Sequence, residues 1–554
     1  MPHVVTQACC GDAACAFACP VNCIHPTPDE PDFATSDMVY IDPQACVDCG
    51  ACVRACPVGA IKPASRLTPD EQVFVELNAL FHAGSDVGNG LESPTRPAQA
   101  PVPPVVRLPA ERRLDVAVVG AGPAALYAAD ELLKQRGVQV TVLDRLPTPH
   151  GLVRAGVAPD HQHTKAITDL FARIEAQPGF SYALGLEVGV DVTHEQLLQR
   201  HHAVVYATGA SADRRLGVPG EDLPGNTTAT AVVAWYNGHP DHVATPIDLD
   251  AERTVVVGNG NVALDVARVL LSDPAQLART DIADHALEAL RTSRLRCVEL
   301  IARRGPAQAA FTVPELVGLL HHPDVDVVVP QRDLLDGDDV KSRLLREGTT
   351  AEPVEGRRHV LLRFLAAPVE VLGERAVTGV RLARTRLETD VDGTVRAMPT
   401  GELDDVATTS VLRSVGYRST PVPGVPFDPV AHRIPNVGGR VLDAAGGALL
   451  SRTYVVGWAK RGPTGFIGTN KSCSLETVNH LLADVALGRL DHESVLGASG
   501  RSGRGQDLVG LDLDAWRRLD AHERVAGREQ GRPRRKVVER ARMLDVVNGV
   551  ASAR

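Results

Sequence analysis

The chain has 554 residues, of which 44% are hydrophobic and 23% are charged, and its formal net charge at neutral pH is −10. This length exceeds that of one ordinary domain, and the composition is typical of folded globular proteins. The mild acidic balance argues against nucleic acid as a partner, and no apolar run reaches the length of a membrane span. The first residues lack the basic region and apolar core of a secretory signal, so we expect a cytoplasmic protein.

Nine of the eleven cysteines lie within the first 56 residues, in two similar runs. The runs are Cys9-x2-Asp12-x2-Cys15-x3-Cys19-Pro20 and Cys46-x2-Cys49-x2-Cys52-x3-Cys56-Pro57. Three closely spaced thiolates can hold one iron–sulfur cluster, while the fourth cysteine reaches across to the other cluster. The spacing therefore predicts two clusters. The expected ligands are Cys19, Cys46, Cys49 and Cys52 for one cluster, and Cys9, Cys15 and Cys56 for the other.

The second ligand set is incomplete, because Asp12 stands where a fourth thiolate is expected. A carboxylate is a harder ligand than a thiolate and holds iron less firmly in such a cluster. We therefore expect one 4Fe–4S cluster together with either a 3Fe–4S cluster or a labile 4Fe–4S cluster. In the labile case, Asp12, Cys10 or solvent would bind the exchangeable iron.

Disulfides and zinc are the alternative explanations of these cysteines. Disulfides require an oxidising compartment, which the start of the chain does not indicate. Zinc accepts C-x2-C pairs, but two tandem runs of four ligand positions exceed what tetrahedral sites need.

The first sixty residues or so resemble bacterial two-cluster ferredoxins of the seven- or eight-iron type, on the strength of the cysteine spacing. After this segment, Thr68-Pro69-Asp70-Glu71 forms a capping box that predicts a helix through Ala83, packed back on the ferredoxin-like part. Residues 84–109 hold six prolines without helical or strand periodicity. They read as a linker that would tether the module as a mobile carrier.

A dinucleotide-binding fingerprint follows the linker. An apolar strand at residues 114–119 breaks into Gly120, Ala121 and Gly122 and then into a helix rich in alanine and leucine. Gly120 permits the tight turn and Gly122 lets the backbone approach a pyrophosphate at the helix N-terminus. The next predicted strand ends at Asp144, where a carboxylate can accept hydrogen bonds from ribose hydroxyls.

A second fingerprint covers residues 254–265, so we expect two dinucleotides. Its glycine turn holds Gly258 and Gly260. The following strand, residues 297–302, ends in Arg303 and Arg304 instead of an acid, which suits the 2′-phosphate of NADPH. Solvated surface arginines are the alternative reading.

With these motifs in place, residues 110 to about 545 resemble the adrenodoxin reductase family of FAD-dependent ferredoxin–NADP reductases. The resemblance rests on both fingerprints, on residues 149–161, on the arginine pair and on residues 457–469. It implies FAD contacts at Ala121, Asp144, Leu152, Val188, Trp458, Gly465, Phe466 and Ile467. It implies NADP contacts at Asn259, Gly260, Asn261, Val262, Arg303, Arg304, Glu315 and Gly465. His161 and Asp265 match polar positions near the flavin and nicotinamide, where they would orient the rings or relay a proton.

The expected fold is α/β, with two nested Rossmann-like domains for FAD and NADP in a glutathione reductase-like arrangement and an N-terminal α+β bacterial ferredoxin domain. The expected divisions are the ferredoxin-like domain at 1–83, the linker at 84–109, the FAD domain at 110–212 and 408–554, and the NADP domain at 213–407. The resemblance implies an NADPH:ferredoxin oxidoreductase. Electrons would pass from NADPH through FAD to the clusters and then to a ferredoxin or a cytochrome P450-type acceptor.

Two other functions use the same architecture. A thiol–disulfide reductase needs a reactive cysteine pair beside the flavin, and only Cys297 and Cys473 remain outside the first 56 residues. Clusters with a purely structural or sensing role are the second alternative.

The tail from residue 507 predicts one or two amphipathic helices, with a basic run at residues 532–536. We expect this run to be either a solvated helix face or a dock for the acidic module.

Overall fold

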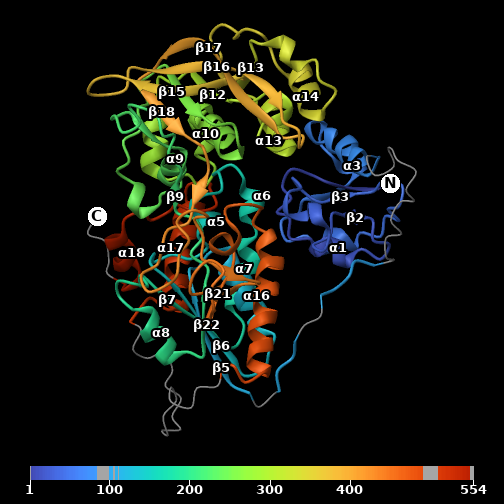
Figure 1. Cartoon of the computed structure of the whole chain (residues 1–554), viewed down its shortest axis with the longest axis vertical. Coiled ribbons are helices and arrows are strands. Elements are labelled where there is room, and N and C mark those ends of the chain that lie inside the picture. Colours follow the sequence, from blue (N-terminus) through green and yellow to red (C-terminus); the bar gives the residue numbers. More distant parts are fainter. Residues whose placement is uncertain (1, 84–98, 104–105, 110–111, 491–508, 550–554) are drawn as a thin grey trace.

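The computed structural model describes residues 2–83, 99–103, 106–109, 112–490 and 509–549. A small N-terminal module lies beside two larger α/β domains and contacts both of them (Figure 1). Most of the predicted linker lies outside the described residues. Near its end, the Leu108 backbone N–H donates to Gln135 Oε1 at 2.9 Å, so this point is anchored on the FAD domain. Among the described residues, none of the helices combines the length and the apolar character that crossing a bilayer requires.

The module consists of two small antiparallel sheets and three helices, with short 3-10 turns between them. The sheets pair β1 (His3–Val5) with β4 (Ile61–Pro63), and β2 (Ile24–His25) with β3 (Tyr40–Ile41). The helices are α1 (Ala14–Ala18), α2 (Ala51–Ala55) and α3 (Val73–Ala83). The predicted capping box is confirmed at Thr68 and Glu71, at the start of the turn that leads into α3. The helix packs back on the module, because Asn78 Oδ1 accepts from the backbone N–H groups of Val5 and Ile41 at 3.2 and 2.9 Å.

The FAD domain is built on a seven-stranded sheet in the order β20-β21-β22-β8-β5-β6-β7. Its strands are β5 (Leu114–Val119), β6 (Val138–Asp144), β7 (Phe180–Leu184), β8 (Ala203–Tyr206), β20 (Asn436–Val437), β21 (Arg440–Leu442) and β22 (Leu449–Val455). Its helices are α4 (Pro123–Leu133), α5 (Leu152–Ala155), α6 (Gln162–Lys165), α7 (Thr168–Glu175), α8 (His194–Arg200), α15 (Trp458–Arg461), α16 (Thr469–Ala486), α17 (Leu513–Arg528) and α18 (Arg540–Val547). The strands from β22 to β7 pair in parallel, and α4 and α16 pack together on the sheet. The two helices α17 and α18 confirm the helical tail that the sequence predicts.

The NADP domain is built on a six-stranded parallel sheet in the order β10-β18-β11-β12-β14-β13. Its strands are β10 (Asn226–Thr228), β11 (Arg253–Val257), β12 (Cys297–Ile301), β13 (Val325–Val328), β14 (Arg358–Arg363) and β18 (Ser410–Arg413), and an antiparallel meander adds β15 (Ala366–Leu372), β16 (Gly379–Thr389) and β17 (Val395–Ala407). Its helices are α9 (Ala229–Tyr236), α10 (Asn261–Leu271), α11 (Pro274–Leu277), α12 (Asp284–Arg291), α13 (Val313–Leu320) and α14 (Val340–Gly348).

The chain crosses twice between the two large domains. The crossing segments β9 (Ala212–Asp213) and β19 (Tyr417–Arg418) pair antiparallel. The return crossing therefore lies a few residues after the expected boundary at 407, and β18 still belongs to the NADP sheet. The NADP domain is inserted into the FAD domain, so the two nested Rossmann-like domains and the α+β module are the architecture that the sequence predicts.

Candidate functional site

The outer cysteine site comprises Cys19, Cys46, Cys49 and Cys52, which line a single cavity together with Cys23. Cys19 caps the C-terminus of α1, while Cys49 precedes α2 and Cys52 lies in its first turn. Cys23 Sγ lies 3.4 Å from Cys19 Sγ, which places it against a predicted ligand instead of in a separate site. The structure thus brings together four thiols from two distant runs, and this donor set fits a 4Fe–4S cluster.

The inner cysteine site comprises Cys9, Cys15 and Cys56. Burial, together with the neighbouring charges of Cys56 and Asp12, raises the pKa of Cys9 to about 11. Burial also raises the pKa of Cys15 well above its ordinary value, with Cys9, Asp12 and Cys56 as its charged neighbours. Buried thiols of this kind are protonated until a metal replaces the proton, so three converging sulfurs fit an iron–sulfur cluster.

Asp12 lies beside the inner site, with its side chain turned partly toward the FAD domain. The side chain is buried, its Oδ1 accepts from the backbone N–H of Ala14 at 3.2 Å, and its Oδ2 lies 3.6 Å from Lys471 Nζ. Burial raises the pKa of Asp12, while the charge of Lys471 opposes that increase. The Asp12 carboxylate therefore pairs with a lysine of α16. A cysteine that served as the fourth ligand would not form this pair.

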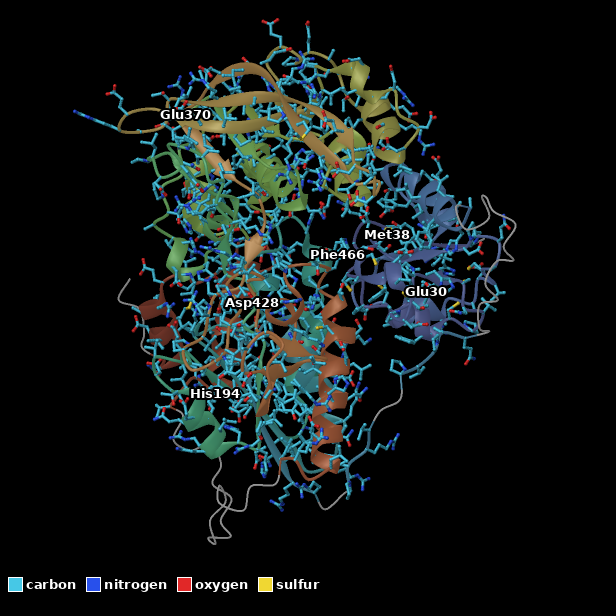
Figure 2. The ribbon with its side chains drawn as sticks, viewed as in Figure 1. Glu30, Met38, His194, Glu370, Asp428 and Phe466 are labelled. Carbon is cyan, nitrogen blue, oxygen red and sulfur yellow. The ribbon has the colours of Figure 1, made fainter. Side chains whose placement is uncertain are left out.

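The inner site lies directly against the turn at residues 465–469 of the FAD domain. The Gly468 N–H donates to the Cys10 carbonyl oxygen at 2.8 Å. Ile467 packs into the same apolar core as Cys9, Cys10 and Cys56. Figure 2 labels Phe466 at the boundary between the module and the FAD domain. The predicted flavin-contacting residues Phe466 and Ile467 thus also lie where the module contacts the FAD domain.

The module also binds the NADP domain. Asp37 Oδ2 accepts from the Val313 N–H at 2.9 Å, and Glu76 pairs with Arg343 at 2.6 Å. Val317 of α13 belongs to the apolar core of the module. Among the described residues, the module therefore contacts both large domains. The sequence did not predict this docking.

The first fingerprint forms the expected strand–turn–helix at β5 and α4. Gly120 has a φ of +104°, and a Cβ there would lie 2.5 Å from the Ala207 carbonyl oxygen, so only glycine fits. Asp144 Oδ2 accepts from the Ala121 N–H at 2.8 Å, which fixes the carboxylate at the turn. A Cβ on Gly122 would meet nothing closer than Gly151 Cα at 4.0 Å, and this space fits a pyrophosphate.

The other predicted FAD residues are distributed around this turn. Leu152 begins α5 and is 40% exposed, whereas the Val188 side chain is buried in an apolar cluster of the FAD domain. Trp458 begins α15, and its Nε1–H donates to the Thr464 carbonyl oxygen at 3.0 Å.

The second fingerprint has the same geometry at β11 and α10. A Cβ on Gly258 would lie 2.1 Å from the Ser414 carbonyl oxygen, whereas a Cβ on Gly260 would meet nothing within 4 Å. Gly260 therefore faces the open space that a dinucleotide phosphate needs. Asn261 Oδ1 accepts from the Thr312 N–H at 2.8 Å and links the turn to α13. Asn259 and Val262 flank this turn, and Arg303 and Arg304 follow β12 as predicted.

His161, Asp265 and Glu315 come together between the two nucleotide turns. His161 Nδ1 lies 3.9 Å from Asp265 Oδ1, and His161 Nε2 lies 3.9 Å from Glu315 Oε2. Burial, together with the nearby Glu315 charge, raises the pKa of Asp265 to about 7. The sequence did not identify Arg268, whose Nη2 contacts His161 Nε2 at 3.0 Å and also pairs with Asp265. The sequence signal that could have identified Arg268 was its spacing on α10, because residues three apart on a helix, such as Asp265 and Arg268, lie side by side.

Arg268 is buried and also pairs with Asp160. Burial lowers the pKa of Arg268 to about 10, which leaves it cationic at neutral pH. The three residues His161, Asp265 and Glu315 could by themselves hold a metal ion, but the Arg268 guanidinium already supplies a positive charge there.

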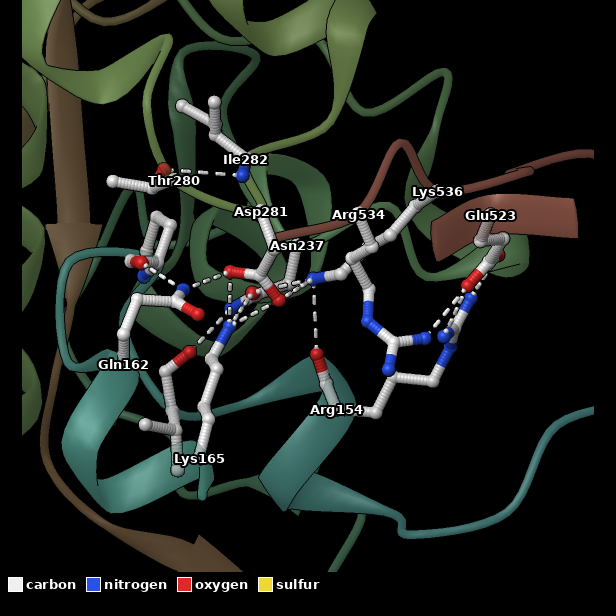
Figure 3. A network of polar contacts seen from close by, with 12 residues as sticks. Arg154, Gln162, Lys165, Asn237, Thr280, Asp281, Ile282, Glu523, Arg534 and Lys536 are labelled. Carbon is white, nitrogen blue, oxygen red and sulfur yellow. Dashed lines mark hydrogen bonds and ion pairs between the residues drawn. The ribbon is translucent and has the colours of Figure 1, made fainter. Parts of the chain in front are cut away.

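Both expectations for the basic run at residues 532–536 are wrong. Figure 3 shows Arg534 and Lys536 of this run in a network of polar contacts. The Lys536 side chain is 1% exposed and lies 3.0 Å from Asp281 of the NADP domain. Asp281 also binds Lys165 of α6 at 2.7 Å. Arg534 pairs with the buried Glu523 at 2.9 Å, and Glu523 also binds Arg154. The run is therefore neither a solvated face nor a dock, because the chain folds it between the two large domains and its charges find acidic partners there.

Two parallel sheets, each with a glycine turn that opens a helix, define an oxidoreductase that binds two dinucleotides. The family described as pyridine nucleotide-disulphide oxidoreductase matches residues 114–299, and the 4Fe-4S binding domain family matches residues 39–62. Over 98% of its length the chain is 51% identical to a probable ferredoxin/ferredoxin–NADP reductase of Mycobacterium tuberculosis, and the match covers 94% of that protein. The chain belongs to the family of fused ferredoxin/ferredoxin–NADP reductases.

Two further relatives lack the N-terminal module. The structure of FprA from Mycobacterium tuberculosis in complex with NADPH has a TM-score of 0.73 and 43% identity, covering 79% of this chain and 100% of FprA. The mitochondrial NADPH:adrenodoxin oxidoreductase of Arabidopsis thaliana is 40% identical over 77% of this chain and 94% of that protein. These matches confirm the family resemblance that the sequence motifs indicate.

Proposed function

We propose that the protein is an FAD-dependent NADPH:ferredoxin oxidoreductase that delivers electrons first to its own ferredoxin module. The observation that carries this proposal is the contact between the 465–469 turn and the inner cysteine site, where Gly468 N–H binds the Cys10 carbonyl. A flavin held at this turn would lie beside the module without any large rearrangement. When bound, FAD exchanges two electrons with a nicotinamide and single electrons with iron–sulfur clusters.

The residues of the two large domains would then position the cofactors. We assign Gly120, Ala121, Gly122 and Asp144 to the FAD pyrophosphate and ribose, because the turn is open at Gly122 and capped by the Asp144 carboxylate. We assign the turn from Asn259 to Val262 to the NADP pyrophosphate, and Arg303 and Arg304 to its 2′-phosphate, since two cations after β12 suit an anion there. The remaining assignments to FAD are Leu152, Val188, Trp458, Gly465, Phe466 and Ile467.

We assign His161 and Asp265 to the orientation of the rings and to proton transfer, and Glu315 of the same cluster to the binding of NADP. The pKa of about 7 leaves Asp265 able to hold a proton on its carboxylate at neutral pH. The cation of Arg268 balances the charge when Asp265 and Glu315 are both ionised.

For the module we propose one 4Fe–4S cluster at the outer site and either a 3Fe–4S or a labile 4Fe–4S cluster at the inner site. The Lys471 partner of Asp12 supports the three-iron alternative, because it draws the carboxylate away from a ligand role. All eleven cysteines lie in the described residues and none is joined in a disulfide, and this usage supports a reducing, cytoplasmic compartment.

The rival functions have less support. Cys297 lies in β12 of the NADP domain and Cys473 in α16 of the FAD domain, so they form no reactive pair. A structural role for the clusters would make the contact with the flavin turn unnecessary.

The test is rapid mixing of the anaerobic holoenzyme with NADPH. We expect the flavin absorbance to bleach before the cluster absorbance, and we expect steady NADPH-dependent reduction of cytochrome c. Cluster reduction that is equally fast after FAD removal would refute the order, and absence of any NADPH-dependent reduction would support a structural role.

A further inference from the structure

Helix α13 lies on the side of the NADP domain that faces the module (Figure 1). Its residue Val317 packs into the apolar core of the module. Its residue Glu315 belongs to the cluster between the two nucleotide turns, where Glu315 Oε2 lies 3.9 Å from His161 Nε2. The helix therefore contacts the module and the candidate site at the same time.

The first turn of α13 is capped by the module. An α-helix cannot satisfy its own first N–H groups, and because Pro314 has no N–H, Val313 provides the first donor of this helix. Among the described residues, the side chain of the N-cap residue Thr312 makes no capping hydrogen bond. Asp37 of the module supplies the acceptor instead, with its Oδ2 at 2.9 Å from the Val313 nitrogen. A carboxylate is a favourable partner there, because the N-terminal end of a helix carries a partial positive charge.

The residues just before α13 hold the second nucleotide turn. The Thr312 N–H donates to Asn261 Oδ1 at 2.8 Å, and the Ala310 N–H donates to Asn259 Oδ1 at 3.4 Å. One residue after Thr312, the backbone donor binds Asp37 of the module. A single short segment therefore binds the nucleotide turn through some of its amides and the module through another.

Lys341 of α14 supports the same segment. Its Nζ donates to the Ala309 carbonyl oxygen at 2.8 Å and lies 5.6 Å from the centre of the Phe311 ring. Burial lowers the pKa of Lys341, while the charge of Asp37 opposes that decrease. Burial likewise raises the pKa of Asp37, while the Val313 N–H and the charge of Lys341 oppose that increase. The two charges therefore stabilise each other across the boundary between the module and the NADP domain.

We propose that Asp37 is a positioning residue for NADP: by capping α13, the docked module orders residues 309–315 and, through them, the nucleotide turn at residues 259–262. This inference rests on the proposed function, which assigns NADP to that turn. Because coupling between two binding events is reciprocal, bound NADP also strengthens the docking of the module. The module is then a part of the nucleotide site as well as the acceptor of its electrons.

The experiment measures NADP⁺ binding by the oxidised holoenzyme, without turnover. Isothermal titration calorimetry gives the Kd of the wild type and of Asp37→Ala, Asp37→Asn and Glu76→Ala. Asparagine keeps an acceptor oxygen and caps helices about as well as aspartate. Glu76→Ala is the matched control, because it removes another carboxylate that the module directs at the NADP domain, in a pair with Arg343 whose side chains are 51% and 32% exposed.

Asp37→Ala should weaken NADP⁺ binding about five- to thirtyfold, which corresponds to the usual effect of losing a helix cap. Asp37→Asn and Glu76→Ala should both bind within about twofold of the wild type, since the amide still caps the helix and a half-exposed ion pair contributes little. Equal Kd values for the wild type and Asp37→Ala, equal weakening by Glu76→Ala, or no recovery with asparagine would each overturn the proposal and leave the proposed function intact.

Hydrogen exchange of the wild type tests the reciprocal effect and needs no variant. Residues 36–41 of the module include Asp37 and none of the predicted NADP contacts. NADP⁺ should slow the exchange of their amides, because it stabilises the docked module. Unchanged exchange in this segment with NADP⁺ bound would overturn the coupling, even if Asp37→Ala failed to fold. A wild type that does not bind NADP⁺ would instead remove the proposed function.

Discussion

The contact between Gly468 and the inner cysteine site can be tested with a single methyl group. Gly468 has ordinary helical dihedral angles, with φ −73° and ψ −26°, so alanine is compatible with its own backbone. A Cβ at this position would lie 2.1 Å from the Asp12 backbone nitrogen and 2.3 Å from its Cα. Ordinary contact begins at 3.4 Å, so the module must retreat by about 1.3 Å.

Overpacking of this kind costs about 1–3 kcal/mol, which corresponds to a docking equilibrium weakened roughly 5- to 150-fold. Hydrogen exchange should report this directly, because the Gly468 amide loses its bond to the Cys10 carbonyl and exchanges faster. In rapid freeze-quench electron paramagnetic resonance, NADPH should still reduce the flavin, but reduction of the clusters should be slower.

The matched control is Gly318→Ala on α13, at the other contact of the module. Its Cβ would meet Gln7 Nε2 at 2.3 Å, but that atom is the end of a flexible side chain and can move. We expect this variant to exchange and transfer electrons like the wild type. If Gly468→Ala shows both wild-type exchange at the turn and wild-type cluster reduction, the docked arrangement is not the one that transfers electrons.

Three other outcomes follow from the described contacts. For the three-iron alternative, Asp12→Cys should supply a fourth thiolate and abolish the three-iron signal in low-temperature electron paramagnetic resonance of the oxidised protein; a three-iron signal that persists unchanged would contradict the ligand assignment. Burial and the nearby Glu315 charge raise the pKa of Asp265 to about 7, so a buried negative charge forms above that pH and should lower kcat/KM for the anionic NADPH. Asp265→Asn should remove this inflection from the pH profile. In denaturant titrations, Asp281→Asn should lower the free energy of unfolding by about 3–5 kcal/mol, because it leaves the buried Lys165 and Lys536 without their shared carboxylate. The control Asp222→Asn, at an exposed ion pair, should change the free energy of unfolding by less than about 1 kcal/mol.

Local patterns made much of the fold predictable. The turns at Gly120 and Gly258 could be located because a strand, a glycine turn and a helix follow one another directly, over residues 114–133 and 253–271. The capping box at Thr68 was predictable for the same reason, since its partners are three residues apart. The spacing of the cysteines likewise indicated which thiols would meet, including the crossover of Cys19 to the second run.

The contacts between distant segments could not be predicted in this way. The module docks through Asp37, Val317 and Gly468, and complementarity between such remote surfaces leaves no periodic trace in a sequence. The basic run was misread because cations are usually solvated, whereas Lys536 is buried against Asp281, more than two hundred residues earlier in the chain. Arg268 was overlooked because an arginine on a helix is ordinarily a surface residue.

The nesting of the domains has a consequence for biosynthesis. The strand β22 completes the flavin sheet beside β8, with Thr453 opposite Val204, yet the ribosome makes it only after the whole inserted domain. The module, by contrast, closes within its first 83 residues and can fold as soon as they emerge. Throughout that interval the turn that will cover Cys10 does not yet exist. Both sets of thiols therefore stay accessible to iron-delivering machinery until translation is nearly finished, and the inner set is enclosed only afterwards.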